Sequence, residues 1–153
     1  MLKLSDSYLF DAPRDQIWPL IFDPQSLLHL IPGCERIDQT GPDEYQSTLK
    51  LSLGAIQENY QVQIKILEED QPRFCRMHGE VNGKNGIISG EAAFELQAEG
   101  KKTSLNYQGS AVITGALGKI NARFMEGVIK TLIRQGLNKL QNQLTSNEPV
   151  HPN

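Results

Sequence analysis

The segment WPLIFDPQSLLHLIPGCE, residues 18–35, constrains the fold more than any other part of the chain. The residue before a proline avoids the helical conformation, whereas proline itself suits the first turn of a helix. Asp23-Pro24 therefore predicts the end of one apolar helix and the start of another, over residues 25–31. Pro32-Gly33 then turns the chain out of the second helix. Two short helices in succession after a strand at 2–10 reduce the number of possible folds, but they do not indicate a chemical reaction.

From about residue 35 to residue 114 the pattern changes to strands. Ile56, Tyr60, Val62, Ile64 and Ile66 share one parity, and polar residues fill most positions between them. This period of two predicts an antiparallel sheet with one buried and one wet face. Short breaks rich in Gly, Pro, Asn and Asp suit hairpin turns between the strands, at 41–43, 54–55, 69–72, 82–86 and 99–101.

A long helix with two apolar stripes is predicted over residues 115–144. The first stripe is expected to face the sheet, and it consists of Leu117, Ile120, Phe124, Val128 and Leu132. The second is offset around the helix, and it consists of Ile129, Ile133, Leu137, Leu140 and Leu144. Either the helix bends near Gly127 or Gly136, or its second half buries a wider surface. A third alternative is that the second stripe is a dimerisation surface.

These elements together predict an α+β fold, in which a curved antiparallel sheet wraps round a long C-terminal helix and two short helices follow the first strand. The chain has 153 residues, which suits one domain at 1–145 followed by a polar tail at 146–153. A net charge of −3 argues against nucleic-acid binding. The N-terminus lacks the apolar core of a signal peptide, so we expect a cytoplasmic protein.

Small residues on the predicted inward face of adjacent strands suggest a protein with an internal ligand-binding cavity. Gly90 and Ala92 on one strand lie opposite Gly109 and Ala111 on the next. Such residues either let strands bend and the helix approach closely, or leave room for a ligand. Small-molecule sites are mostly apolar and aromatic. The residues predicted to line this cavity are Trp18, Leu49, Leu53, Tyr60, Met77, Phe94, Tyr107, Phe124 and Val128.

The sequence contains no evident catalytic or metal-binding set. His78 and Cys75 are an odd number of residues apart on a predicted strand, so they point to opposite faces and no metal site is predicted. Cys34 is better explained as a packing thiol than as a nucleophile. The alternative to a non-enzymatic binding protein is an enzyme of the same fold, such as a cyclase, aromatase or hydrolase. It would need an acid or base inside the cavity, and the candidates are Arg76, His78 and Glu80.

The predicted long helix also carries most of its charge as cations. Lys119, Arg123, Lys130 and Arg134 fall on a face opposite the first apolar stripe. A basic face of this kind is either solvated or contacts an anionic membrane or an acidic partner.

Several short motifs are spread over about residues 2–145, and the stretch from Ile31 to Glu35 is the most specific. The motifs are Phe10-x-x-Pro13, Trp18, Asp23-Pro24, Ile31-Pro-Gly-Cys-Glu35, Asp43-Glu-Tyr45, Gly54, Gly90-Glu-Ala92, Thr103-x-Leu-x-Tyr107 and Thr114-Gly-Ala-Leu-Gly118. Together they resemble the CoxG family of carbon monoxide dehydrogenase subunits. That family belongs to the START-like, helix-grip (SRPBCC) superfamily of ligand-binding proteins.

The resemblance implies a deep apolar cavity between the sheet and the long helix, which binds a quinone-like or lipid-like molecule without a covalent cofactor. It implies a non-enzymatic accessory role beside a molybdenum-containing carbon monoxide dehydrogenase or a related hydroxylase, with peripheral contact at the inner membrane face. Some members reach the membrane through a long C-terminal extension. Here the residues after the predicted helix are few and polar, so contact would fall to the basic face or the second stripe. No catalytic residue is carried over.

Overall fold

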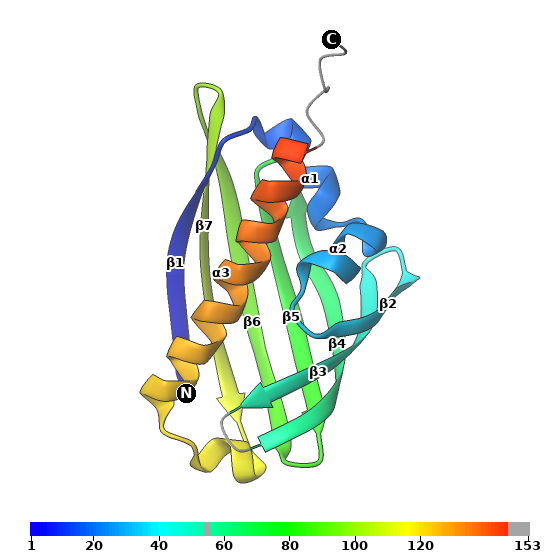
Figure 1. The fold of residues 1–153 in the computed structure, drawn as a ribbon, viewed down its shortest axis with the longest axis vertical. Coiled ribbons are helices and arrows are strands. Elements are labelled where there is room, and N and C mark those ends of the chain that lie inside the picture. Colours follow the sequence, from blue (N-terminus) through cyan, green and yellow to red (C-terminus); the bar gives the residue numbers. More distant parts are fainter. Residues whose placement is uncertain (54–55, 147–153) are drawn as a thin grey trace.

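Seven antiparallel strands form one sheet in the computed structural model, which describes residues 1–53 and 56–146 (Figure 1). The strand order is β1-β7-β6-β5-β4-β3-β2, so the first strand pairs with the last and each other strand pairs with its neighbour in sequence. The strands are β1 (Leu2–Phe10), β2 (Cys34–Gly41), β3 (Glu44–Leu53), β4 (Ile56–Asp70), β5 (Phe74–Gly83), β6 (Gly86–Glu99) and β7 (Lys102–Ile113).

Helices cover one face of this sheet. The sheet curves around α3, and α1 and α2 lie beside the C-terminal half of α3 (Figure 1). This arrangement confirms the predicted α+β helix-grip architecture. The predicted turn at 54–55 lies outside the described residues, as does the predicted tail at 146–153 apart from Ser146, which ends α3. The helices are α1 (Arg14–Ile21), α2 (Pro24–Leu30), the 3-10 helix η1 (Gly115–Lys119) and α3 (Ala122–Ser146).

The strands follow the predicted alternation. On β4, Tyr60, Val62 and Ile66 are buried, whereas Gln61 and Gln63 are exposed. β-branched and aromatic residues pack well on a pleated surface with one covered face, and this face is the one that α3 covers. The even-numbered positions of β4 therefore point into the protein.

The predicted single helix over 115–144 is wrong at its start. Residues 115–119 form the separate helix η1, and α3 begins only at Ala122. The Asn121 side chain accepts hydrogen bonds from the backbone N–H groups of Arg123 and Phe124, at 2.9 and 3.2 Å. Asparagine is a favoured residue for this capping role, so Asn121 explains why the long helix starts there.

The first turn of α3 buries a different residue from the one predicted. Met125 is buried, whereas Phe124 is 49% exposed and does not face the sheet as the first stripe predicted. Leu140 and Leu144 of the second stripe are buried in the core. The second half of α3 therefore buries a wider surface, as one of the alternatives stated. The second stripe does not offer the exposed surface that the dimerisation hypothesis requires.

The segment from α2 to β2 has the geometry that its prolines and glycine predicted. Asp23 caps α2, since its carboxylate accepts hydrogen bonds from Gln25 N at 3.3 Å and Ser26 Oγ at 3.0 Å. Gly33 has a φ of +76°, and a Cβ there would overlap the carbonyl oxygen of Lys50. The Gly33 carbonyl in turn accepts a hydrogen bond of 2.8 Å from Lys50 N. These contacts hold the turn after α2 against β3.

The buried residues form two apolar clusters along α3. The first cluster lies near α1 and the C-terminal half of α3, and includes Trp18, Phe94 and Leu140. The second cluster lies near η1 and the N-terminal half of α3, and consists of Leu2, Tyr60, Leu117 and Met125. A space between α3 and the sheet is bounded by residues from both groups.

Candidate functional site

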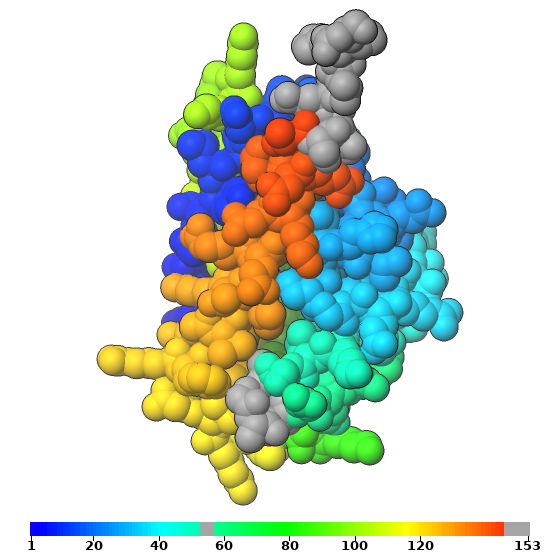
Figure 2. Space-filling view, in the orientation of Figure 1, coloured from blue at the N-terminus to red at the C-terminus, as the bar shows by residue number. Residues whose placement is uncertain are grey.

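An apolar cavity lies between α3, α2 and the inner face of the sheet. Its volume is about 400 Å³, within the range of small-molecule sites. The space-filling view is hollowed between α3 and the segments that contain α2 and β3 (Figure 2). None of the lining residues is charged. They are Ile21, Leu27, Leu30, Ile31, Pro32, Leu49, Leu51, Met77, Ala92, Ala93, Phe94, Leu105, Tyr107, Leu132, Ile133, Gly136, Leu137 and Leu140.

Ala92 shows most directly that this space is open. It lies in the middle of β6, opposite Met77 on β5 and Gly109 on β7. A mid-strand residue on the covered face of a sheet is ordinarily buried, yet Ala92 is exposed. Phe94, two residues further along the same face, is buried. Phe94 is covered by the rings of Trp18 and Phe22, at 5.8 and 6.3 Å, whereas Ala92 borders the open space between the sheet and α3.

Two contacts set the shape of the wall on the α2 side. Gly136 of α3 packs against the end of α2, where an added Cβ would lie 3.2 Å from the carbonyl oxygen of Leu30. The turn at Pro32 is held against β3 by the Gly33 contacts with Lys50. The α2 segment thus closes one side of the cavity with Leu27, Leu30, Ile31 and Pro32.

The structure brings together part of the set predicted to line a cavity. Leu49, Met77, Phe94 and Tyr107 lie on the cavity wall. Trp18 lies behind it, with its ring 5.8 Å from that of Phe94, so it supports the wall from the core.

The other predicted lining residues lie elsewhere. Tyr60 and Val128 belong to the second cluster, in line with the cavity along α3. Phe124 borders a surface depression beside Arg123 and Thr131, because α3 begins later than predicted. The side chain of Leu53 lies outside the described part of the chain.

The small residues on β6 and β7 have both roles considered from the sequence: some allow close packing, and one leaves room for a ligand. A Cβ on Gly90 would overlap the backbone of Ser110 on β7, so this glycine allows close contact between strands. A Cβ on Gly109 would lie 3.3 Å from Ala92 Cβ, which is also close packing. Ala92 itself leaves room for the cavity. The open space therefore comes from alanine, and the glycines shape the sheet.

Sequence reasoning missed the contributions of α2 and of the second half of α3. Ile133, Leu137 and Leu140 belong to the second apolar stripe, and all of them line the cavity. The signal was present in that stripe and in the apolar run Leu27–Ile31. The width of the apolar face showed that the helix buries more than one row of residues, but not that a cavity separates it from the sheet.

The polar residues considered for catalysis point away from the cavity. Arg76 forms ion pairs with Glu68 and Glu91 at 3.5 and 3.7 Å, and His78 Nε2 lies 3.8 Å from Glu80 Oε1. Their neighbour Met77 faces the cavity, so these three even-numbered residues of β5 lie on the outer face of the sheet. An enzyme that uses Arg76, His78 or Glu80 inside the cavity is therefore contradicted.

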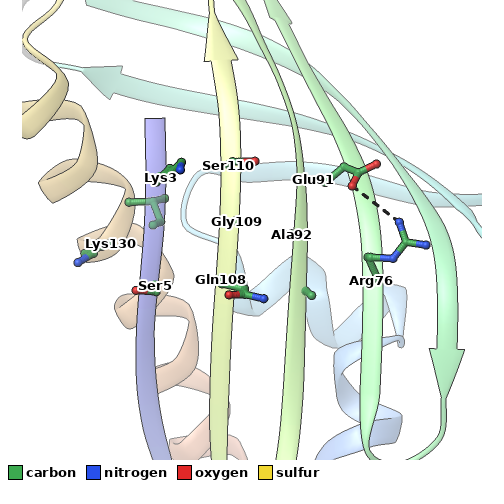
Figure 3. Close-up of a pocket in the computed structure, with 11 residues that line it drawn as sticks. Lys3, Ser5, Arg76, Glu91, Ala92, Gln108, Gly109, Ser110 and Lys130 are labelled. Carbon is green, nitrogen blue, oxygen red and sulfur yellow. Dashed lines mark ion pairs between the residues drawn. The ribbon is translucent and has the colours of Figure 1, made fainter. Parts of the chain in front are cut away.

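Figure 3 shows a second depression, on the outer face of the sheet, where Arg76 and Glu91 pair across β5 and β6. Its volume is about 480 Å³, and Lys3, Ser5 and Gln108 also line it. It is open, and polar and apolar atoms contribute about equally to its lining. An apolar ligand would lose little water contact there, so the cavity under α3 is the stronger candidate site.

Tyr107 is the one lining side chain of the described cavity with a polar group. It lies opposite Asp6 on β1, and Asp6 pairs with Arg134 of α3 at 3.0 Å. Burial and the Asp6 charge raise the pKa of Tyr107. Hydrogen bonds from Ser7 N–H and Arg134 lower the pKa of Asp6. Tyr107 is therefore neutral at physiological pH. The Asp6 and Arg134 charges beside it form an ion pair with each other.

The Asp6–Arg134 pair also corrects the predicted basic face. Arg134 is tied to β1 and lies over the Tyr8 ring at 5.8 Å, so it is not a free cation of that face. Lys119 belongs to η1, while Arg123 and Lys130 belong to α3. Lys119 and Arg123 are exposed, and both precede the exposed Phe124 in the chain.

The cysteines form no reactive arrangement in the described structure. Cys75 is buried, and burial raises the pKa of its thiol to about 11. Cys34 Sγ lies 3.3 Å from Ser47 Oγ, at the turn into β2. Within residues 1–53 and 56–146, no group of three or more His, Cys, Asp or Glu side chains could hold a metal ion. Among the same residues, no helix is long and apolar enough to cross a membrane.

Comparison with solved structures finds this fold repeatedly. A conserved protein from Geobacillus kaustophilus superposes with a TM-score of 0.90 at 25% identity, over 95% of this chain and 96% of that one. A START superfamily protein from Mycobacterium smegmatis gives 0.71 at 10% identity, over 94% and 99%. The ZhuI aromatase/cyclase from Streptomyces sp. R1128 gives 0.68 at 15%, over 92% of each chain.

These likenesses confirm the START-like helix-grip fold. A comparison with curated proteins found no match. The model of one protein family, the carbon monoxide dehydrogenase subunits called CoxG, matches residues 9–145, which include both short helices, the whole sheet after β1 and nearly all of α3. The chain therefore belongs to the CoxG family of carbon monoxide dehydrogenase subunits.

Proposed function

We propose that this protein is a non-catalytic binding protein that holds a lipophilic molecule, quinone-like or lipid-like, in the cavity under α3. The observation that carries the proposal is the cavity itself: about 400 Å³, with a wall of apolar side chains and Tyr107. Water in such a space makes few hydrogen bonds. An apolar ring or chain that replaces it gains roughly 25 cal/mol per Å² of buried apolar surface.

The chemistry of the wall favours binding over reaction. General acid–base catalysis needs a titratable group within hydrogen-bond reach of the reacting atom. Around the described cavity, Tyr107 is the one side chain that could serve, and burial and the Asp6 charge raise its pKa. The aromatase/cyclase among the structural neighbours shares the fold at 15% identity, and fold alone does not carry an activity.

The family name supports an accessory role beside a carbon monoxide dehydrogenase. In this proposal the partner is a molybdenum-containing dehydrogenase or a related hydroxylase, and the bound molecule serves that enzyme. Biolayer interferometry with the immobilised protein and the purified dehydrogenase tests the partnership. Saturable binding supports it, and no binding at micromolar dehydrogenase contradicts it.

Weak contact with an anionic membrane surface is a further part of the proposal, at the end of the molecule where α3 begins. Phe124 is 49% exposed there, directly after the exposed Arg123 and five residues after the exposed Lys119. An exposed aromatic side chain with cations nearby in the chain suits the interface of an anionic bilayer. Co-sedimentation with phosphatidylserine vesicles tests this. Phe124→Ser should release the protein, whereas Arg134→Gln should not, because Arg134 is paired with Asp6.

The ligand proposal is tested by extracting purified protein with organic solvent and identifying co-purified lipids by mass spectrometry. The stripped protein is then titrated with decylubiquinone, with Trp18 fluorescence as the signal. Trp18 contacts the ring of Phe94, which lines the cavity, so occupancy should change its emission. An empty extract together with no saturable change up to the solubility limit would contradict the proposal.

A further inference from the structure

A buried tyrosine hydroxyl without a partner belongs to the apolar cluster that adjoins the cavity. Among the described side chains, Tyr60 Oη is the one buried polar atom that finds no hydrogen-bond partner. Tyr60 is 1% exposed. Buried tyrosine hydroxyls are ordinarily bonded, because water is lost without replacement when they are not. An unpaired hydroxyl in a position this enclosed calls for a functional explanation.

The backbone places Tyr60 beside the cavity wall. Tyr60 on β4 lies directly opposite Leu49 on β3, so both side chains stand on the inner face of the sheet. Leu49 lines the cavity and also packs against the cluster that contains Tyr60, and Leu51 does the same. Leu49 and Leu51 therefore border both the cavity and the cluster that contains Tyr60.

The helix shows the same continuity. Val128 and Ile129 of α3 pack on the Tyr60 cluster, and Leu132 and Ile133 line the cavity. These pairs are four residues apart, which is one helical turn, or about 5.4 Å. The Tyr60 cluster therefore continues from the cavity by one turn of α3, toward η1.

Neighbouring residues pack against the Tyr60 ring, but none of the described residues forms a hydrogen bond with its hydroxyl. The ring lies against Gly83 of β5, where an added Cβ would come within 2.6 Å of it. The neighbouring carboxylate of Glu58 accepts hydrogen bonds from Lys84 N, Asn85 N and Asn85 Nδ2. The Tyr60 hydroxyl makes no hydrogen bond to this carboxylate, and burial keeps the hydroxyl protonated by raising its pKa.

We propose that the Tyr60 hydroxyl donates a hydrogen bond to a carbonyl oxygen at the inner end of the bound molecule. This inference rests on the proposed function, and it narrows the ligand class to lipophilic molecules with a carbonyl acceptor at the end nearest η1. A pure hydrocarbon would leave the hydroxyl unpaired. A carbonyl compound would satisfy it in a site from which water is excluded, where such a bond discriminates most strongly.

The test uses two ligands and two variants. 2,3-Dimethyl-1,4-naphthoquinone and 2,3-dimethylnaphthalene share a carbon skeleton and differ in the two carbonyl groups, and neither adds readily to thiols. We expect Tyr60→Phe to weaken binding of the quinone about tenfold, the usual loss for one neutral hydrogen bond. Binding of the hydrocarbon should stay within about twofold. Isothermal titration calorimetry measures both.

Tyr45→Phe is the matched control. It also removes a buried tyrosine hydroxyl, but that hydroxyl donates to the carbonyl of Phe22 at 3.2 Å, within the protein. It should therefore destabilise the fold and affect both ligands alike, whereas Tyr60→Phe should leave the urea midpoint of the stripped protein unchanged or raised.

The outcomes separate the two proposals. Equal effects of Tyr60→Phe on the quinone and the hydrocarbon would overturn the role of Tyr60 while leaving the cavity as a binding site. Failure of the wild-type protein to bind either molecule would overturn both proposals.

Discussion

Replacing Ala92 with leucine asks whether the space beneath α3 accepts apolar volume. Ala92 lies mid-strand under the helix, yet it is exposed, and it lines the cavity. Its neighbours on the adjacent strands are Met77, which has a flexible side chain, and Gly109, which has no side chain. A leucine there would extend three further carbons into the cavity.

Whether Ala92→Leu raises or lowers the free energy of unfolding distinguishes an open space under α3 from a close-packed one. Each buried CH₂ group contributes about 0.8 kcal/mol. Three carbons in a partly open cavity should therefore stabilise the stripped protein by about 1–2 kcal/mol. In a close-packed interior the same change forces strained rotamers and costs about 1–3 kcal/mol. The lost volume should also weaken binding of decylubiquinone at least about tenfold.

Urea unfolding of the stripped protein, followed by Trp18 fluorescence, measures the stability change. Ala98→Leu is the matched control, because Ala98 is an exposed position at the end of the same strand and is not part of the cavity wall. It should change stability by less than about 0.5 kcal/mol and leave ligand affinity unaltered. A destabilised Ala92→Leu with unchanged ligand affinity would refute the existence of the cavity.

Three further predictions concern the elements around the site, each measured by urea unfolding. Gly33→Ala should destabilise the protein by at least about 2 kcal/mol, because the new Cβ would overlap the Lys50 carbonyl at a positive φ. Asp23→Ala should cost about 1 kcal/mol through loss of the α2 cap, and Asp23→Asn should cost much less. For Cys75 the folded pKa of about 11 exceeds the unfolded value, so stability should fall between about pH 8.5 and 11 by about 1–2 kcal/mol more than in Cys75→Ala.

Each of these has an outcome that contradicts its reasoning. A Gly33→Ala variant as stable as wild type would show that the turn after α2 is not held against β3. An Asp23→Asn variant as unstable as Asp23→Ala would locate the effect in charge rather than in capping. Parallel stability curves for wild type and Cys75→Ala above pH 8.5 would mean that the folded thiol titrates as it does in the unfolded chain.

Local sequence signals predict most of the fold. Asp23-Pro24 and Pro32-Gly33 act through backbone conformation within a few residues, so the boundaries of α2 can be read directly. The alternation on β4 is also local, since one parity is buried and the other wet. The start of α3 differs from the prediction because η1 continues the apolar periodicity of the helix, and the apolar pattern does not reveal the capping hydrogen bonds of Asn121.

The cavity depends on distances between elements that are far apart in sequence, so the sequence predicts it only in part. Leu49 and Phe94 can be placed on the wall from their parity on the strands. The contributions of Leu30 and Gly136 depend on how closely α2 approaches α3, which no local pattern specifies. Arg134 cannot be paired with Asp6 from the sequence, because the two are 128 residues apart.

The most direct test of the central claim is a filtered nuclear Overhauser experiment, on stripped protein with ¹³C-labelled Leu, Ile and Met methyl groups and unlabelled decylubiquinone. We expect contacts from the ligand to the methyl groups of Leu49, Met77, Ile133 and Leu137, which line the cavity from β3, β5 and α3. Contacts confined to exposed methyl groups such as those of Leu9, Leu67 and Ile87, or no contacts at all, would contradict a ligand site under α3.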